Sequence, residues 1–153
     1  MFSWRTALVL VAGLSLAAGD KDQAVQKEMS KLEGTWTVVR QEQRGNLVPP
    51  VVSRRGGLLI EDGTLKWLVS GREAGNQTAD FAIDPTKSPK TIDIEITRGS
   101  FIGKKQLGIY RLNGDKLEVC WGDTETAKRP TKFTTKAGIG SGFEYTVYKR
   151  NKD

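Results

Sequence analysis

The chain has 153 residues, one cysteine, no histidine and a formal net charge of +6. A single cysteine excludes an intramolecular disulfide, and the lack of histidine removes the usual general base and the commonest metal ligand. A Ser-His or Cys-His nucleophile is therefore excluded within one chain. We expect a non-enzymatic protein that needs no metal and no cofactor.

The first 19 residues have the pattern of a secretory signal peptide. Arg5 precedes an apolar run at positions 7–16, small residues follow, and the chain becomes polar at Asp20. The apolar run is shorter than the roughly 20 residues that span a bilayer, so an uncleaved anchor is the less favoured alternative. We expect residues 1–19 to be removed and residues 20–153 to form one secreted or periplasmic domain without a transmembrane span.

Basic residues occur in clusters along the chain. Such clusters can bind anionic partners, but on a small domain they also serve solubility. Acidic residues lie among most of them, which favours the second interpretation. No zinc-finger spacing, aromatic RNA-binding motif or long basic helix is present, so we expect no nucleic-acid partner. The clusters are Arg54-Arg55, Lys104-Lys105, Lys128-Arg129 and 149–152.

Residues 21–32 are predicted to form a short helix that ends before Gly34, because their apolar positions recur at helical spacing. Beyond Gly34 the apolar period changes to two, which is typical of half-buried strands. The clearest alternation places Ile92, Ile94 and Ile96 on one face, which we expect to be buried. The predicted strands are 35–40, 58–60, 65–69, 76–84, 91–97, 106–112, 116–121 and 143–150.

Glycine-containing turns separate several of these strands, as at 61–63 and 113–115. Eight short strands with one helix predict an all-β antiparallel barrel or sandwich. We favour the barrel, because closure removes exposed sheet edges. A barrel of eight strands is just wide enough to be filled by side chains or to hold one small ligand.

Three stretches carry a resemblance to a known family: 32–36, 84–93 and 108–120, the last followed by 129–133. They resemble a family of small, secreted, lipocalin-like domains of unknown function, found mainly in planctomycete bacteria. The resemblance covers nearly all of the expected mature chain. It implies an eight-stranded lipocalin-like barrel in a secreted or periplasmic protein, and it implies no known activity.

Lipocalins themselves pair a Gly-x-Trp on the first strand with a basic residue near the end of the last. Gly34 and Trp36 match the first part, and Arg150 is the candidate for the second. The resemblance therefore implies that these three residues close the barrel, with the guanidinium over the indole. The usual Thr-Asp-Tyr is replaced by Asn-Gly-Asp at 113–115 and the disulfide is absent, so a lipid-carrier function would be fold analogy alone.

Two groups of residues are candidates for chemistry. Cys120 could be a reactive thiol aided by Arg129, but a small buried packing residue is the favoured interpretation. Asp93 and Glu95 could form a carboxylate pair for glycoside hydrolysis, but they alternate with the isoleucines and are expected in solvent. The glycine-rich stretch 138–142 lacks the strand-to-helix context of a phosphate loop and is predicted to be a hairpin connection.

Large apolar side chains on the strands are the candidates for a ligand site. They are drawn from both faces of the strands, so we expect that not all of them line one cavity, and they could equally be core. The leading hypothesis is a small apolar or amphipathic ligand in the barrel. The alternative is a filled interaction module whose basic loops, Arg54-Arg55 and 128–136, dock on an anionic envelope component or another protein. The ligand candidates are Trp36, Trp67, Phe81, Ile94, Tyr110 and Trp121.

Overall fold

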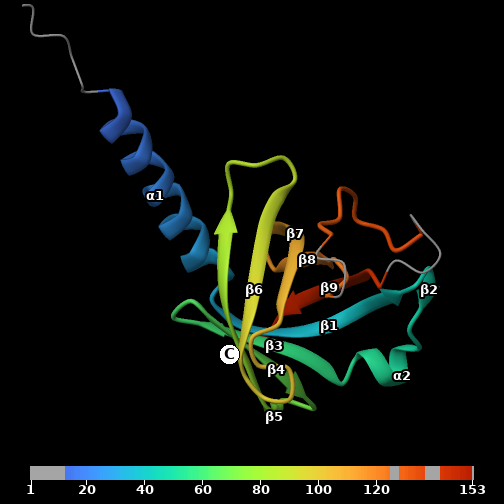
Figure 1. The fold of residues 1–153 in the computed structure, drawn as a ribbon. Coiled ribbons are helices and arrows are strands. Elements are labelled where there is room, and N and C mark those ends of the chain that lie inside the picture. Colours follow the sequence, from blue (N-terminus) through green and yellow to red (C-terminus); the bar gives the residue numbers. More distant parts are fainter. Residues whose placement is uncertain (1–12, 125–127, 137–141, 153) are drawn as a thin grey trace, which may run out of the picture.

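Antiparallel pairing joins each of eight long strands to the next in the computed structural model, which describes residues 13–124, 128–136 and 142–152. Pairing of the first of these strands with the last closes the sheet into a barrel (Figure 1). The predicted eight-stranded antiparallel barrel with an N-terminal helix is thereby confirmed. The strands are β1 (Gly34–Gln43), β3 (Gly56–Glu61), β4 (Thr64–Val69), β5 (Arg72–Asp84), β6 (Lys90–Arg98), β7 (Lys105–Asn113), β8 (Lys116–Trp121) and β9 (Glu144–Arg150).

Three further elements complete the fold. Helix α1 (Gly13–Leu32) precedes β1, while the two-residue strand β2 (Asn46–Leu47) and the one-turn helix α2 (Pro50–Ser53) lie between β1 and β3. Helix α1 begins eight residues before the predicted start at 21, inside the predicted signal segment. The rest of that segment, residues 1–12, lies outside the described residues.

Strand β5 differs most from the prediction, because it begins at Arg72 and not at 76. Ser70 and Gly71 form the missed turn, with φ angles of 53° and 76°. Two consecutive residues with positive φ are what a two-residue hairpin turn requires. A register shift between Lys66 and Leu68 follows, and it leaves Trp67 without a direct partner on β5.

The core lies inside the barrel and is built by the period-two alternation. Ile92, Ile94 and Ile96 are all buried there, as predicted. The six ligand candidates also share the inner surface, so the expectation that they came from both faces was wrong. The sequence pattern does not show that the six residues share one surface, because a β-bulge changes which residues of a strand face inward. Five belong to the buried core, namely Trp36, Phe81, Ile94, Tyr110 and Trp121, and Trp67 packs against it.

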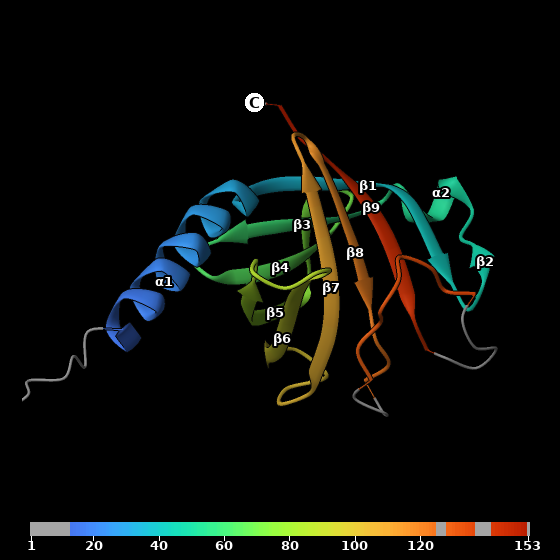
Figure 2. The ribbon, with the colours of Figure 1, turned by 90° about the horizontal axis from the view of Figure 1, so that it is seen from above.

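Helix α1 covers one end of the barrel (Figure 2). Leu32 is fully buried in the core, and Val25 and Met29 pack against it from the same helix. The indole Nε1–H of Trp36 donates to the Leu32 carbonyl at 2.9 Å, which satisfies one acceptor at the helix C-terminus. Because strands alternate in direction, the hairpins at 61–64, 84–90 and 113–116 share this end, which we call the closed end.

Arg150 joins the two ends of the sheet. Its register partner is Trp36, and its guanidinium carbon lies 4.2 Å from the centroid of the indole ring. The guanidinium also donates to the carbonyls of Lys31 and Glu33. Gly34 has a φ of +124°, and a Cβ there would lie 2.8 Å from Arg150 Nη1, so the close approach requires glycine. We call Gly34, Trp36 and Arg150 the clasp.

A strap formed by residues 128–136 lies over the outer surface of β7–β9. Phe133 makes an edge contact with Tyr145, with ring centroids 6.2 Å apart, and the Thr134 carbonyl lies 3.8 Å from Cys120 Sγ. The apolar face of β9 formed by Phe143, Tyr145 and Val147 therefore faces outward, whereas Tyr148 belongs to the core. The strap explains why β8 is buried on both faces.

Replacing either Arg150 or Trp36 should reduce the contribution of the other side chain to the free energy of unfolding. We expect Arg150→Met to lower the free energy of unfolding by about 2 kcal/mol, because the Lys31 and Glu33 carbonyls lose a charged donor. A double-mutant cycle with Trp36→Leu should give a coupling free energy of about 0.5–2 kcal/mol, measured by urea denaturation. Two effects that simply add would show that the guanidinium and the indole do not interact.

Candidate functional site

The open end of the barrel, opposite α1, contains a recess of about 220 Å³. Its walls come from the ends of β4, β6 and β8 and the beginnings of β5, β7 and β9, which meet at this end because the strands alternate. We call it the mouth recess. It is lined by Trp67, Gln77, Ile96, Phe101, Lys104, Gln106, Trp121, Thr124 and Glu144.

Two tryptophans form the inner wall of the mouth recess. Trp121 is buried, and its register partner on β7 is Gly108. A Cβ at Gly108 would lie 2.7 Å from the Trp121 ring, so glycine allows the indole to lie against β7. Trp67 is half-buried at the register shift between β4 and β5. The local irregularities of the sheet thus place two indole rings at the opening.

Polar groups surround these rings. The Glu144 carboxylate accepts hydrogen bonds from Gln43 at 2.8 Å and from Thr146 at 3.1 Å. Gln43 reaches Glu144 because the bulge at Val39 shifts the register of β1 against β9 by one residue. The Gln106 amide donates to the Gly122 carbonyl at 2.7 Å.

One cation also stands at the recess. The Lys104 ammonium lies 5.4 Å from the centroid of the half-exposed Phe101 ring, and both side chains line the opening. The recess therefore combines aromatic faces with a carboxylate, two amides and an ammonium group. A few convergent polar groups on an apolar wall are the usual composition of a small-molecule site.

The volume limits what the recess can hold. Drug-sized pockets measure roughly 300–1,000 Å³, so about 220 Å³ suits one ring or a short chain. Of the ligand candidates, only Trp67 and Trp121 line the recess. The other four, Trp36, Phe81, Ile94 and Tyr110, pack in the core below it. A long acyl chain would have to displace that core.

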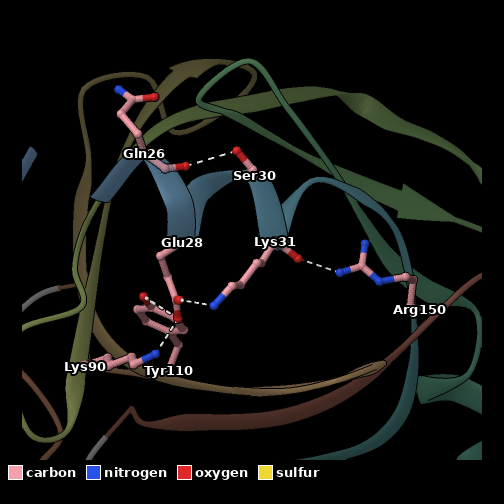
Figure 3. A network of polar contacts seen from close by, with 7 residues as sticks. All are labelled: Gln26, Glu28, Ser30, Lys31, Lys90, Tyr110 and Arg150. Carbon is pink, nitrogen blue, oxygen red and sulfur yellow. Dashed lines mark hydrogen bonds and ion pairs between the residues drawn. The ribbon is translucent and has the colours of Figure 1, made fainter. Parts of the chain in front are cut away.

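A buried ion-pair network lies at the closed end (Figure 3). Glu28 of α1 accepts from Lys90 and lies 3.5 Å from both the Lys31 ammonium and the Tyr110 hydroxyl. Burial alone would raise the pKa of Glu28, but the bond to Lys90 and the charges of Lys90 and Lys31 together lower it. Burial, and then the nearby Glu28 charge, raises the pKa of Tyr110. Since its members satisfy one another, we assign this network to fixing α1 on the barrel.

Cys120 lies beneath the strap and is fully buried. Burial raises the pKa of its thiol to about 11, so the nucleophilic thiolate is disfavoured at neutral pH. Arg129, the suggested activator, instead binds Asp93 through Nη2–Oδ2 at 3.0 Å and donates to the Gly108 carbonyl at 2.7 Å. The geometry therefore favours the packing interpretation of Cys120.

The two outward carboxylates of β6 are each paired with a cation. Asp93 binds Arg129 of the strap, and Glu95 lies 3.3 Å from the ammonium of Lys105. A hydrolytic pair would have to flank a substrate with free oxygens, which this arrangement does not offer. Within the described residues, no group of three or more histidine, cysteine or acidic side chains could hold a metal ion. The glycine-rich stretch lies outside the described residues except for Gly142.

Glu118 is the polar residue that sequence reasoning missed. It alternates with the core residues Leu117 and Val119, which predicts an outward face, yet its side chain is buried. Its oxygens accept from Arg111 Nε at 2.7 Å, Arg111 Nη2 at 2.9 Å and the Tyr145 hydroxyl at 2.6 Å. The hydrogen bond from Arg111 is the main reason that the pKa of Glu118 falls to about 2. The same guanidinium lies 4.7 Å from the Phe133 ring, which holds the strap in place.

No family model, curated protein or solved structure matches this chain. In the part of the chain that the structure describes, no helix has the length and apolar character needed to cross a membrane.

Because of Glu118, the free energy of unfolding should depend on pH in the acid range. Its folded-state pKa of about 2 lies below the ordinary value of 4.5, so its contribution is complete above pH 4.5 and is lost as the pH falls toward 2. We expect Glu118→Gln to lower the free energy of unfolding by about 2 kcal/mol at neutral pH, with the difference disappearing in acid. Urea denaturation across this pH range measures it.

Glu95→Gln is the matched control, because Glu95 makes an exposed pair with Lys105. Such surface pairs contribute little, so its pH profile should follow that of the parent chain. An equal loss in both variants, or a Glu118→Gln profile parallel to the parent, would contradict the assignment.

Proposed function

We propose that this protein is a secreted or periplasmic, non-enzymatic barrel that binds a small amphipathic molecule in the mouth recess. The supporting observation is the pair of indoles, Trp67 and Trp121, at an opening that also carries Glu144 and Lys104. An aromatic ring or short alkyl group would stack on the indoles. Its polar end would meet the amides and charges at the rim.

The filled interior decides the size of the ligand. Trp36, Tyr110 and Ile94 occupy the space that a deep lipid pocket would need, and all three are buried. Displacing them would cost several kcal/mol of packing. We therefore propose single-ring or short-chain amphiphiles as the ligand class, in place of long fatty acids or retinoids.

Binding, and not catalysis, is the proposal because the reactive groups are occupied. Cys120 is covered by the strap, Asp93 is held by Arg129, and Glu118 is held by Arg111. The carboxylate at the recess, Glu144, accepts two hydrogen bonds that orient it as a fixed acceptor. These contacts favour recognition of a donor group on a ligand.

Calorimetric titration tests the site. We expect single-ring amphiphiles such as indole-3-acetate or tryptamine to bind, and palmitate to bind no more tightly than octanoate, because only a short chain fits. Gln77→Trp fills the recess and should weaken binding at least tenfold, which corresponds to about 1.4 kcal/mol. The parent and variant are titrated under the same conditions.

Gln23→Trp provides the control, since Gln23 is exposed on α1, far from the open end. It should bind like the parent chain. Equal weakening in both variants would remove the mouth recess as the site. Binding of none of the four probes by the parent would favour the alternative function, a filled module that docks on an anionic envelope component.

Export is the second part of the proposal. The contacts that the structure gives between α1 and the barrel begin at Lys21, which lies 3.0 Å from Asp84, and Ala18, Gly19 and Asp20 are exposed. Removal of residues 1–19 would therefore leave these contacts in place. Produced with its own N-terminus in a Gram-negative host, the protein should reach the periplasm with Asp20 as its first residue. Intact mass measurement tests this, and an unprocessed cytoplasmic chain would contradict it.

A further inference from the structure

Basic residues predominate in three of the four connections at the open end of the barrel, and one of these residues, Lys105, pairs with Glu95 of β6. The loops are 43–56, 69–72 and 98–105, and none of them contains a carboxylate side chain. The hairpins at the closed end differ because they carry both signs of charge, with Glu61, Asp62, Asp84 and Asp115 beside Lys87, Lys90 and Lys116. The two ends of the barrel therefore differ in charge. The basic residues of the three loops are Arg44, Arg54, Arg55, Arg72, Arg98, Lys104 and Lys105.

The same three loops carry most of the exposed large apolar side chains. Among the described residues seven such side chains are exposed, and six of them lie in these loops. The seventh, Val39, lies on β1. Solvent exposure reaches 72% for Val51 and 68% for Ile102. The six are Leu47, Val51, Val52, Val69, Phe101 and Ile102. We call the three loops, with these apolar and basic residues, the open-end rim.

Local structure holds the apolar side chains outward. The single turn of α2 buries Ser53, so Val51 and Val52 face solvent on its other side. In the β6–β7 loop, Gly103 N–H donates to the Ile96 carbonyl and Ile96 N–H donates to Lys104, which leaves Phe101 and Ile102 at the tip. Figure 2 shows α2 and β2 on the far side of the barrel from α1.

We propose that the open-end rim docks the barrel on an anionic lipid bilayer. Apolar side chains that enter the boundary of the acyl chains, flanked by Lys and Arg at headgroup level, are what an interfacial membrane site requires. The negative surface potential of such a membrane attracts each nearby basic residue. A soluble polyanion would form ion pairs with the basic residues of the rim, but it would leave the exposed apolar side chains in water.

Docking in this way would turn the mouth recess toward the bilayer, because the recess and the rim lie at the same end of the barrel. Phe101 and Lys104 belong to both the rim and the recess. The bilayer is thus a source from which an amphiphile could enter. The docking proposal does not depend on the recess holding a ligand, since it rests on the charge and exposure of the loops.

Vesicle co-sedimentation tests the proposal. We expect the full chain to bind vesicles of phosphatidylcholine mixed with phosphatidylglycerol more tightly than phosphatidylcholine alone, with affinity falling as salt rises. Arg54→Gln/Arg55→Gln should weaken binding to the mixed vesicles about thirtyfold. Val51→Asn should weaken it at least fivefold, because an apolar contact is lost. Every variant carries the same N-terminal segment, so its apolar run contributes equally.

The control variants remove the same kinds of side chain, basic or apolar, from surfaces outside the open-end rim. Lys87→Gln/Lys149→Gln takes two exposed charges from the closed end, and Val39→Asn takes an exposed valine from β1. Both should bind like the parent. Equal losses in test and control variants, or equal affinity for the two vesicle types, would overturn the proposal. Retention on dextran sulfate without vesicle binding would also overturn it and assign the rim to a soluble polyanion. Calorimetric titration without vesicles reports separately on the recess.

Discussion

Pairing of β1 with β9 closes the barrel, and the Arg150 guanidinium contacts the Trp36 indole at one end of that pairing. The pairing joins the last strand to the first, where the sheet would otherwise end in two open edges. The same guanidinium caps the C-terminal turn of α1 by donating to the carbonyls of Lys31 and Glu33. Barrel closure and helix attachment are therefore coupled, since both need the extended side chain of Arg150.

The proposed binding site lies at the opposite end of the barrel from the clasp. At the closed end the clasp and the Glu28 network attach α1 to the barrel, and a shallow recess of about 440 Å³ lies beside them. At the open end the polar residues Gln77, Gln106 and Glu144 line a recess that the core does not fill. The three basic and apolar loops lie at the same end as this recess.

The period-two pattern predicted the barrel well, because apolar positions alternate along strands such as β6 and turn residues separate most of the strands. The start of β5 was missed since the Ser70-Gly71 turn has no strong sequence signal and a bulge follows it. The clasp could be proposed from Gly34, Trp36 and Arg150 by resemblance. The mouth recess could not, because it depends on the bulge at Val39 and on the absent side chain at Gly108, neither of which a period-two pattern shows. A buried Cys120 was the favoured interpretation and is found. The burial of Glu118 was hidden, because alternation describes one layer and not what covers it.

The central claim is that the interior is filled and that recognition takes place at the mouth. Indole N–H signals in ¹H–¹⁵N NMR spectra report on it directly, because Trp67 and Trp121 line the recess while the Trp36 N–H is bonded to the Leu32 carbonyl. On titration with indole-3-acetate, the account predicts shifts of the Trp67 and Trp121 signals and an unchanged Trp36 signal. A shift of the Trp36 signal comparable to the other two would contradict it, since the ligand would then have entered the barrel.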